Sequence, residues 1–324
     1  MKDPFVLQVN DLHIHFTADG HSVPVVRGLS YTLATGRVLA VVGESGSGKT
    51  VHALSLLGLL PPAAHVEKGE ILYKGKNLLT MPENQLRTIR GRKISMIFQD
   101  PSASLNPVLT IGEQLIETLR AHRPLPPKEA RKEAVQLLEQ VGITQADKRL
   151  DEYPFQFSGG MCQRVMIAMA LALSPDILIA DEPTTALDVT IQAQIIQLIK
   201  QLQGKNGMAV IFITHNLALA SQVADEVLVM YGGLCMEQAP VDELFNHPKH
   251  PYTRGLLASL VSVDAERPDR LPAIGGTPPV AGECGCGCPF APRCSYAEAK
   301  CSHQLPPLLA QVNHRVRCWP EELP

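Results

Sequence analysis

Residues 43–50 read Gly-Glu-Ser-Gly-Ser-Gly-Lys-Thr, and this stretch decides the fold. Glycines at these spacings let the backbone wrap closely enough that consecutive N–H groups point at phosphate oxygens. Lys49 supplies a point charge for the β- and γ-phosphates, and the hydroxyl of Thr50 is suited to ligate Mg²⁺. The segment therefore predicts a phosphate-binding loop. Its candidate nucleotide-binding residues are Gly43, Ser45, Gly46, Ser47, Gly48, Lys49 and Thr50.

The residues on either side of the loop have the pattern that such a loop requires. Residues 38–42 (Val-Leu-Ala-Val-Val) form a short apolar run typical of a buried strand, and residues 51–60 have the pattern of a helix. The N-terminus of a helix presents unpaired N–H groups and partial positive charge, so it favours an anion. Strand, loop and helix together predict nucleotide binding.

Asp181 and Glu182 follow another apolar run, residues 177–180, which also reads as a strand. An Asp at the carboxyl end of a parallel strand lies at the edge where the phosphate loop opens, so it can hold the Mg²⁺ shell. Glu182 can orient or deprotonate a water in line with the γ-phosphate. The alternative is an acidic pair that only caps the next helix.

Gln99 and His215 each end a further apolar strand, residues 94–98 and 209–213. Sheet geometry would bring both to the edge that carries Glu182. The order of loop, Gln, Glu and His along the chain favours a catalytic role for Gln99, Glu182 and His215 over plain polar strand ends. The candidate ligands of Mg²⁺ are Thr50, Gln99 and Asp181.

Residues 157–161 read Phe-Ser-Gly-Gly-Met and precede a helix that is apolar almost all round. Ser158 is expected to be its N-cap, and a helix that starts with Gly159 and Gly160 exposes N–H groups that can bind a second anion. The alternative is a simple helix cap. A second phosphate site in one domain makes sense if it grips ATP that a neighbouring subunit holds.

Apolar strands alternate with helical patterns over much of the chain, which predicts a parallel α/β sheet. From about Asp100, apolar residues recur at helical spacing, and we interpret residues from about 100 to 175 as a helical insertion. After about Pro248 the composition shifts towards Pro, Gly and Cys. We expect this tail to have little core of its own.

The composition of the 324 residues is that of an ordinary globular protein, with 45% hydrophobic and 19% charged residues. A net charge of −3 gives no polyelectrolyte signature, so nucleic acid is not an expected partner. The start lacks the basic and then apolar run of a signal peptide, and no apolar stretch reaches the roughly 18 residues of a membrane span. We expect a cytosolic chain whose membrane role, if any, comes through a partner.

With the phosphate loop at 43–50, Gln99, the signature at 157–161, the strand and acidic pair at 177–182, and His215, residues 5–245 resemble the ATP-binding cassette family. The resemblance implies an α/β fold with a parallel-sheet core, an antiparallel β subdomain and the helical insertion, within an ATPase domain at residues 1–250. It implies a head-to-tail dimer with ATP between the loop of one subunit and the signature of the other, and a D-loop at residues 186–188. Phe16 is the candidate for stacking on adenine, or else a plain core residue. The other implied nucleotide contacts are Ser158, Gly159, Gly160 and Asp188.

Finer features resemble the oligopeptide/dipeptide/nickel importer ATPases. They are Phe-Gln-Asp-Pro at residues 98–101, Ser-Leu-Asn-Pro at 104–107, the run at 159–168 and His-Pro-Tyr-Thr at 250–253. The resemblance implies a peripheral subunit at the cytoplasmic face of the bacterial inner membrane. Its implied partners are a sister ATPase, two transmembrane permeases and, indirectly, an extracytoplasmic solute-binding protein. Three residues depart from the pattern: Phe157 for Leu, Cys162 for Arg and Asn216 for Asp.

Six of the eight cysteines lie after residue 283. In a reducing compartment such a cluster favours a metal site over disulfides. The spacing leaves zinc, an iron–sulfur cluster or a metal-free packed tail open. Residues 251–324 resemble the C-terminal extension of the peptide-importer ATPases, and this resemblance implies a [4Fe-4S] cluster with Cys284 and Cys286 as extra thiols. We expect His303 and His314 to be surface residues. The implied cluster ligands are Cys288, Cys294, Cys301 and Cys318.

The leading hypothesis is an ATP hydrolase that powers import of peptides or a related solute, with ATP and Mg²⁺ at a dimer interface. One alternative is a cassette ATPase without a transport role, acting on nucleic acid or ribosomes. Such proteins usually carry two cassettes or a long coiled-coil insertion, and this sequence has neither. Another alternative is a redox-regulated ATPase subunit in which the cysteine-rich tail is the output.

Overall fold

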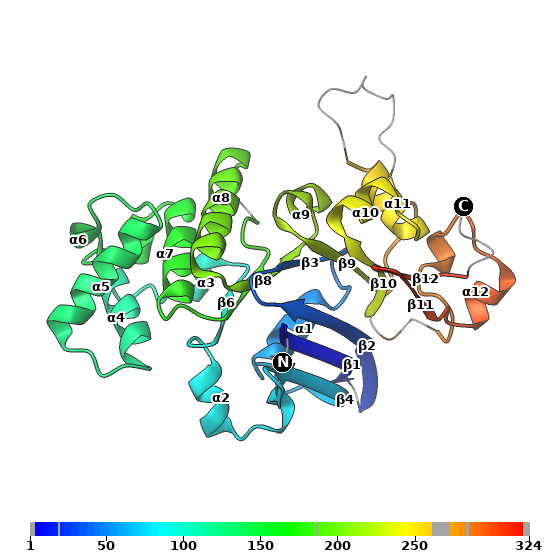
Figure 1. Ribbon diagram of the computed structural model, residues 1–324, viewed down its shortest axis with the longest axis horizontal. Coiled ribbons are helices and arrows are strands. Elements are labelled where there is room, and N and C mark those ends of the chain that lie inside the picture. Colours follow the sequence, from blue (N-terminus) through cyan, green and yellow to red (C-terminus); the bar gives the residue numbers. More distant parts are fainter. Residues whose placement is uncertain are drawn as a thin grey trace. The chain divides into compact units, whose positions relative to one another are not determined.

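The computed structural model describes residues 4–18, 20–185, 187–260, 273–280, 282 and 285–319 (Figure 1). The chain divides into two compact units. The first unit comprises Met1–Leu33, Val38–Thr80 and Phe212–Pro324, and the second comprises Ala34–Arg37 and Met81–Ile211. Among the helices that the structure describes, none combines the length and apolar character that crossing a membrane requires.

The first unit contains a four-stranded sheet in the order β2-β1-β4-β5. In it, β1 (Phe5–Ala18) pairs antiparallel with β4 (Ala64–Tyr73), and β4 pairs antiparallel with β5 (Lys76–Asn77). β2 spans His21–Ala34, and its later residues alternate between buried and half-buried positions. This alternation is typical of a strand with one face on a core. The antiparallel β subdomain implied by the resemblance is confirmed.

A second sheet in this unit is mixed. Strand β3 (Val38–Val42), which leads into the phosphate loop, is buried at every residue and pairs in parallel with β9 (Glu226–Tyr231). Burial on both faces explains its continuous apolar sequence. Beyond β9, the strands β10 (Leu234–Pro240), β12 (His314–Arg317) and β11 (Leu308–Gln311) are all antiparallel. The helices of this unit are α1 (Lys49–Leu56), α9 (Leu217–Val223), α10 (Val241–Asn246), α11 (Pro251–Ala258) and α12 (Ala299–His303), with 3-10 turns η1 (Leu78–Thr80) and η3 (Ala291–Arg293).

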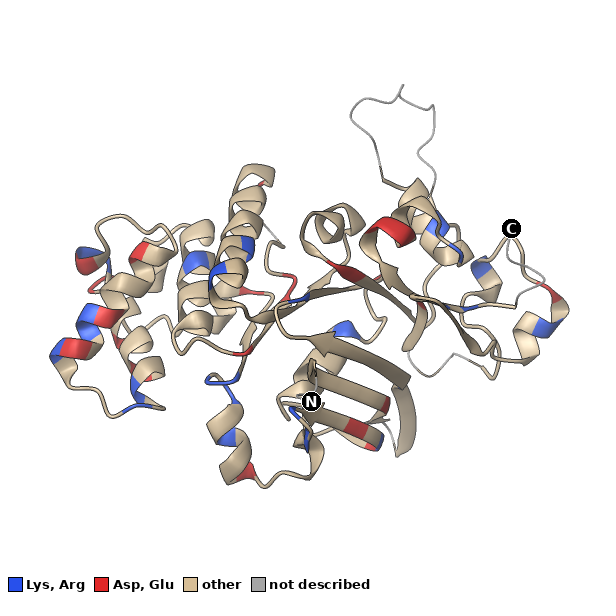
Figure 2. Ribbon diagram, in the orientation of Figure 1, with Lys and Arg blue, Asp and Glu red and all other residues tan. Residues whose placement is uncertain are grey.

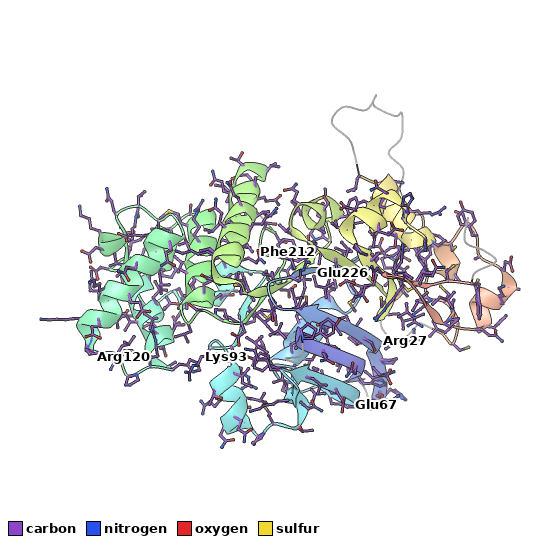
Figure 3. All side chains as sticks on the ribbon, viewed as in Figure 1. Arg27, Glu67, Lys93, Arg120, Phe212 and Glu226 are labelled. Atoms are coloured by element: carbon purple, nitrogen blue, oxygen red, sulfur yellow. The ribbon has the colours of Figure 1, made fainter. Side chains whose placement is uncertain are left out.

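The C-terminal extension packs against the strands of this unit. Its strand β12 pairs with β10, and Phe290 belongs to the same apolar cluster as Tyr231 and Tyr252. Arg27 of β2, labelled in Figure 3, donates from Nη2 to the carbonyl oxygen of Gly285 at 3.4 Å. The extension thus joins the core formed around β9 and β10, and that it has little core of its own stays a prediction.

A buried carboxylate connects the extension to the sheet. Glu237 of β10 is fully buried, and its oxygens accept hydrogen bonds from the backbone N–H groups of Lys249 (2.7 Å) and His250 (3.0 Å). His314 Nε2 lies 2.7 Å from the same carboxylate and is 2% exposed. These bonds lower the pKa of Glu237 against the opposing effect of its burial. The expectation that His314 lies at the surface is wrong, whereas His303 is exposed.

In the second unit, β6 (Ile94–Ile97) pairs in parallel with β7 (Ile177–Asp181), which confirms the parallel arrangement predicted for these two strands. In the strand order of the sheet, β7 lies between β6 and β8 (Ala209–Thr214), and β8 begins in this unit. Its helices are α2 (Glu83–Ile89), α3 (Pro101–Ser104), α4 (Ile111–Arg120), α5 (Pro127–Gln140), α6 (Ala146–Arg149), α7 (Gly159–Leu171) and α8 (Val189–Asn206), with the 3-10 turn η2 (Pro154–Gln156).

The helices of the second unit carry the signals that predict them. Thr110 and Glu113 form a reciprocal capping box at the start of α4, which presents an apolar face to its neighbours. Basic and acidic residues are interspersed along α5 and α6 (Figure 2), and Arg131 of α5 binds Asp147 of α6 and Asp151, which follows α6. The helices α3 to α7 lie between residues 101 and 171, in agreement with the helical character predicted from about residue 100 to 175.

Candidate nucleotide-binding site

The phosphate loop leaves β3 and enters α1, as its sequence predicts. Gly43 has φ +156°, and a Cβ there would lie 2.2 Å from the carbonyl oxygen of Met230. Gly48 has φ +96°, and its Cβ would lie 2.8 Å from the carbonyl oxygen of Val25. Both positions exclude a side chain by contact as well as by conformation. The loop is thus shaped by a backbone path that only glycine permits.

Lys49 is buried at the base of this loop, with 6% of its surface exposed. Its ammonium donates to the carbonyl oxygens of Gly43 (2.7 Å) and Glu44 (2.9 Å) and lies 3.3 Å from the hydroxyl of Ser47. The charge therefore lies within the curve of the loop, where phosphate oxygens can take over these contacts. Ser45, Gly46 and Thr50 are exposed, and Thr50 lies in the first turn of α1.

His215 follows β8 and is exposed. The next residue, Asn216, is the N-cap of α9, and its Oδ1 accepts from the backbone N–H groups of Ala218 (2.9 Å) and Leu219 (3.3 Å). Asn caps a helix about as well as Asp does. The departure from the family pattern at Asn216 therefore keeps the turn that presents His215.

The second unit brings Gln99 and Glu182 together. Gln99 Nε2 donates to Glu182 Oε2 at 3.2 Å, as expected for residues that end neighbouring parallel strands. Asp181, the last residue of β7, is 1% exposed. The acidic pair does not cap α8, because its N-cap is Asp188, whose Oδ1 accepts from the N–H of Ile191 at 2.9 Å. The capping alternative for Asp181 and Glu182 is thereby excluded.

Glu182 is held in an unusual backbone conformation, with φ +46° in a residue that is not glycine. Such conformations cost of order 1–3 kcal/mol and persist where surrounding contacts enforce them. The Thr185 hydroxyl supplies one such contact by donating to Glu182 Oε2 at 2.8 Å. Sequence reasoning missed Thr185. The signal was available, because a hydroxyl three residues beyond a turn residue can bond back to it.

The signature segment forms the predicted cap. Ser158 Oγ accepts from the N–H of Met161 at 3.3 Å, and α7 begins at Gly159. Ser158 and Gly159 are exposed. A Cβ at Gly160 would lie 3.0 Å from Ile191 Cγ2, so this glycine lets α7 lie close to α8. The start of α7 is thus accessible at Ser158 and Gly159.

Two departures in this segment are buried. Phe157 is 9% exposed, and the Arg149 guanidinium lies 5.6 Å from its ring centre. Cys162 is 5% exposed, and its thiol donates to the carbonyl oxygen of Pro154 at 3.6 Å. Burial raises the pKa of this thiol. The Cys162 side chain therefore packs inside the protein and contributes little to the surface of α7.

The remaining candidates are less informative. Phe16 lies on β1 opposite Ala64 and is half-buried, so its stacking on adenine stays a prediction. The side chain of Asp188 is occupied as a cap, and a role across a dimer interface also stays a prediction. Ala186, the first residue of the predicted D-loop, lies outside the described residues.

Comparison with known proteins agrees with this geometry. A family model described as ABC transporter matches residues 26–185, and one described as oligopeptide/dipeptide transporter, C-terminal region, matches residues 236–301. The chain is 50% identical to the dipeptide transport ATP-binding protein DppD of Bacillus subtilis, over 97% of this chain and 94% of that protein. The chain belongs to the ATP-binding cassette family. Within it, the chain falls in the branch of the oligopeptide/dipeptide transporter ATP-binding proteins.

Other proteins and solved structures are also similar to this chain. The oligopeptide transport ATP-binding protein OppD of Bacillus subtilis is 48% identical over 97% of this chain and 88% of its own length. A solved dimer of the ATP-binding cassette MJ0796, bound to ADP and Pi, is 26% identical with a TM-score of 0.66, over 72% of this chain and 98% of that one. The structure of cbiO1 from Clostridium perfringens is also 26% identical, with a TM-score of 0.64, over 76% of this chain and 92% of that one. Like other cassettes of this family, the chain is an ATP hydrolase.

The cysteines of the cassette's extension lie in different environments. Cys301 is buried, Cys288, Cys294 and Cys318 are half-buried, and Cys286 is exposed. The N–H of Cys288 donates to the carbonyl oxygen of Cys301 at 2.7 Å. Burial raises the pKa of the Cys288 thiol to about 11, and Cys301 and Cys294 add to this rise. Cys284 lies outside the described residues.

The described residues do not fit a metal cluster as they stand. Thiolates are the donors that an iron–sulfur cluster uses, so the chemistry of the four cysteines is suitable. However, the described residues contain no group of three or more His, Cys, Asp or Glu side chains that could hold a metal ion. The cluster implied by the resemblance has no support in this geometry.

Proposed function

We propose that this chain is the ATP-binding subunit of an importer that takes up dipeptides, oligopeptides or a related small solute. The main support is similarity along nearly the whole chain, at 50% identity, to a dipeptide transport ATP-binding protein. The match of residues 236–301 to the C-terminal region of oligopeptide/dipeptide transporters supports the same branch. These relatives do not favour the alternative of a cassette ATPase without a transport role.

In the proposed site, the loop amides and Lys49 bind the β- and γ-phosphates. Thr50, Asp181 and Gln99 are suited to hold Mg²⁺, which neutralises charge on the phosphate oxygens when it is bound. Glu182 accepts a proton from the attacking water or orients it, and His215 contacts the γ-phosphate. The hydrogen bonds from Gln99 and Thr185 to Glu182 support this role, because they fix the direction in which its carboxylate points.

We propose that a neighbouring ATPase subunit completes the site. Its Ser158, Gly159, Gly160 and Asp188 equivalents would enclose the triphosphate, in a heterodimer with a sister ATPase. The exposure of Ser158 and Gly159 supports this arrangement. Two permeases would anchor the pair at the cytoplasmic face of the bacterial inner membrane, fed by an extracytoplasmic solute-binding protein. The second unit exposes large apolar side chains that suit docking to a permease, namely Phe98, Val108, Tyr153 and Phe155.

Solute uptake in cells that lack the gene tests the proposal. We expect the wild-type chain to restore uptake of labelled dipeptides or oligopeptides, and Lys49→Ala to fail because the phosphates lose their point charge. Lys128→Ala, at an exposed position of α5, is the matched control and should restore uptake. Equal uptake with Lys49→Ala and wild type would contradict the phosphate-loop assignment. Co-purification of permeases from detergent-solubilised membranes tests the partners.

A finer proposal concerns the extension, in which Cys288, Cys294, Cys301 and Cys318 would ligate a [4Fe-4S] cluster. The hydrogen bond from the N–H of Cys288 to the carbonyl oxygen of Cys301, at 2.7 Å, brings two of these residues close together, although the described residues form no ligand group. Iron and sulfide analysis of protein purified without oxygen tests this. About four irons per chain, lost on Cys301→Ser, would support the cluster. Iron-free protein would end the proposal.

A further inference from the structure

Glu44, the second residue of the phosphate loop, is bound on three sides. Its carbonyl oxygen accepts from Lys49 within the loop, at 2.9 Å. Its N–H donates to the hydroxyl of Tyr252 at 3.0 Å. Its carboxylate receives a two-pronged contact from Arg293, with Nη1 to Oε2 at 2.6 Å and Nη2 to Oε1 at 3.1 Å. Two of the three contacts therefore come from residues beyond position 250.

The Arg293 guanidinium is also held by hydrogen bonds to groups other than Glu44. Its Nε donates to the carbonyl oxygen of Gly275 at 2.8 Å and its Nη2 to that of Ile274 at 3.2 Å. Its Nη1 donates to the Tyr231 hydroxyl at 3.0 Å, and its side chain is only 5% exposed. Because these hydrogen bonds already hold the planar guanidinium, it loses little conformational entropy when it binds the Glu44 carboxylate. This arrangement differs from a surface ion pair, which contributes little.

Tyr252 is equally constrained. It is fully buried in α11, and its ring lies 4.6 Å from that of Tyr231 and 5.3 Å from that of Phe290, between ring centres. Burial raises the pKa of its hydroxyl, which therefore stays protonated at neutral pH. The aromatic cluster thus presents two hydroxyls: that of Tyr252 accepts the N–H of Glu44, and that of Tyr231 accepts from Arg293.

A carboxylate in a loop that receives a triphosphate needs neutralising. Two like charges a few ångströms apart repel by several kcal/mol where water is partly excluded, at an effective dielectric constant of about 20. The Arg293 contact offsets the charge of Glu44 and fixes the position of its carboxylate. The N–H bond to Tyr252 fixes the peptide that joins Gly43 to Glu44, next to the point where Gly43 passes Met230.

We propose that Arg293 and Tyr252 are positioning residues of the ATP site. By fixing Glu44 they hold the first turn of the phosphate loop in its binding conformation, so that nucleotide affinity depends on the docked C-terminal extension. The proposal rests on the proposed function of the loop. The competing explanation is a clamp that only attaches the extension and leaves ATP affinity unchanged.

Steady-state ATP hydrolysis and equilibrium binding of Mg·ATP by the purified full-length chain separate the two explanations. We expect Arg293→Ala to raise KM and Kd about tenfold with a smaller change in kcat, which is the effect of losing a charge-assisted hydrogen bond. Arg293→Lys keeps the charge but not the fork, and should raise both a few-fold with Tm retained. Tyr252→Phe keeps the ring and loses the acceptor, and should raise KM about two- to fivefold.

A double-mutant cycle isolates the charge effect. In the Arg293→Ala background, Glu44→Gln removes the unpaired carboxylate, and we expect it to recover part of the lost affinity. Arg317→Ala is the matched control, because this arginine of the extension donates to the carbonyl oxygens of Cys235 and Pro306 and not to the loop. It should lower Tm without raising KM.

A wild-type KM in Arg293→Lys and Tyr252→Phe, with only Tm lowered, overturns the inference. Arg293 and Tyr252 would then only attach the extension to the rest of the chain. The same holds if Arg317→Ala and Arg293→Ala raise KM equally. A wild-type chain that binds no Mg·ATP overturns the proposed function instead, so the two failures are distinguishable. If Arg293→Ala does not fold, the Lys and Phe variants carry the test.

Discussion

The two units hold their reactive groups in different ways. In the first unit, the phosphate loop is shaped by its backbone: Gly43 and Gly48 pass too close to other carbonyl groups to carry a side chain. In the second unit, the carboxylate of Glu182 is placed by the side chains of Gln99 and Thr185, on a backbone that is itself strained. The loop should therefore fail when a side chain is added, and the carboxylate should fail when one is removed.

The largest expected effect is at the carboxylate. Glu182→Gln keeps the shape and the capacity to bond with Thr185, but it cannot accept a proton, so turnover should fall by about 10²–10⁴-fold while ATP binding persists. Phosphate release and nucleotide binding measured on the same preparation check this. Glu117→Gln, exposed on α4, is the control and should be neutral. Wild-type turnover in Glu182→Gln would show that another group acts as the base.

How far the sequence predicts this molecule depends on the range of the interactions. The loop and its place between a strand and a helix could be predicted, because its motif lies within eight consecutive residues. The meeting of Gln99 and Glu182 could also be predicted, because parallel strands align their carboxyl ends. The contacts of Arg293 and Tyr252 with Glu44 span 249 and 208 residues, and no local pattern encodes them.

The error at His314 has the same cause. His314 was expected at the surface, but a four-residue strand pairs it into a sheet and against Glu237. Such a strand is too short for its alternation to stand out from chance. Thr185 was missed for a different reason, because Asp181 and Glu182 already accounted for the motif that precedes it. Local motifs therefore predict which groups react, whereas distant packing decides what holds them.

The second-largest expected effect tests whether the backbone shapes the phosphate loop. Gly43→Ala should lower ATP affinity by at least a hundredfold, because its Cβ would meet a backbone carbonyl at 2.2 Å that cannot move alone. Gly46→Ala is the matched control: its φ is +79°, but open space surrounds the new Cβ. Gly46→Ala should lower ATP affinity only through conformational strain of about 1–2 kcal/mol, which is roughly tenfold. Equal losses at the two positions, measured by equilibrium ATP binding, would mean that conformation alone matters.

A smaller effect is expected at Thr185. Thr185→Ala removes one hydrogen bond to a carboxylate, worth about 1.5–3 kcal/mol at most, so kcat should fall about tenfold with KM little changed. Thr185→Ser restores the hydroxyl and should recover most of the rate. A merely structural role would instead lower Tm in both variants and leave kcat per folded molecule intact. Thermal melting and steady-state kinetics on both variants distinguish these results.

The smallest effect is expected at Asn216, where a side chain shapes a loop of the first unit. Asn216→Asp restores the residue common in the family and should change stability by less than about 0.5 kcal/mol, because both side chains accept the N–H groups of Ala218 and Leu219. Asn216→Ala removes the cap and should cost about 1 kcal/mol, with a modest loss of kcat as the turn after β8 no longer holds His215. Denaturant unfolding and ATPase assays measure the two effects. If Asn216→Ala lowered kcat as far as Glu182→Gln does, Asn216 would take part in the reaction itself, and the contrast between a backbone-shaped loop and a side-chain-placed carboxylate would no longer separate the two units.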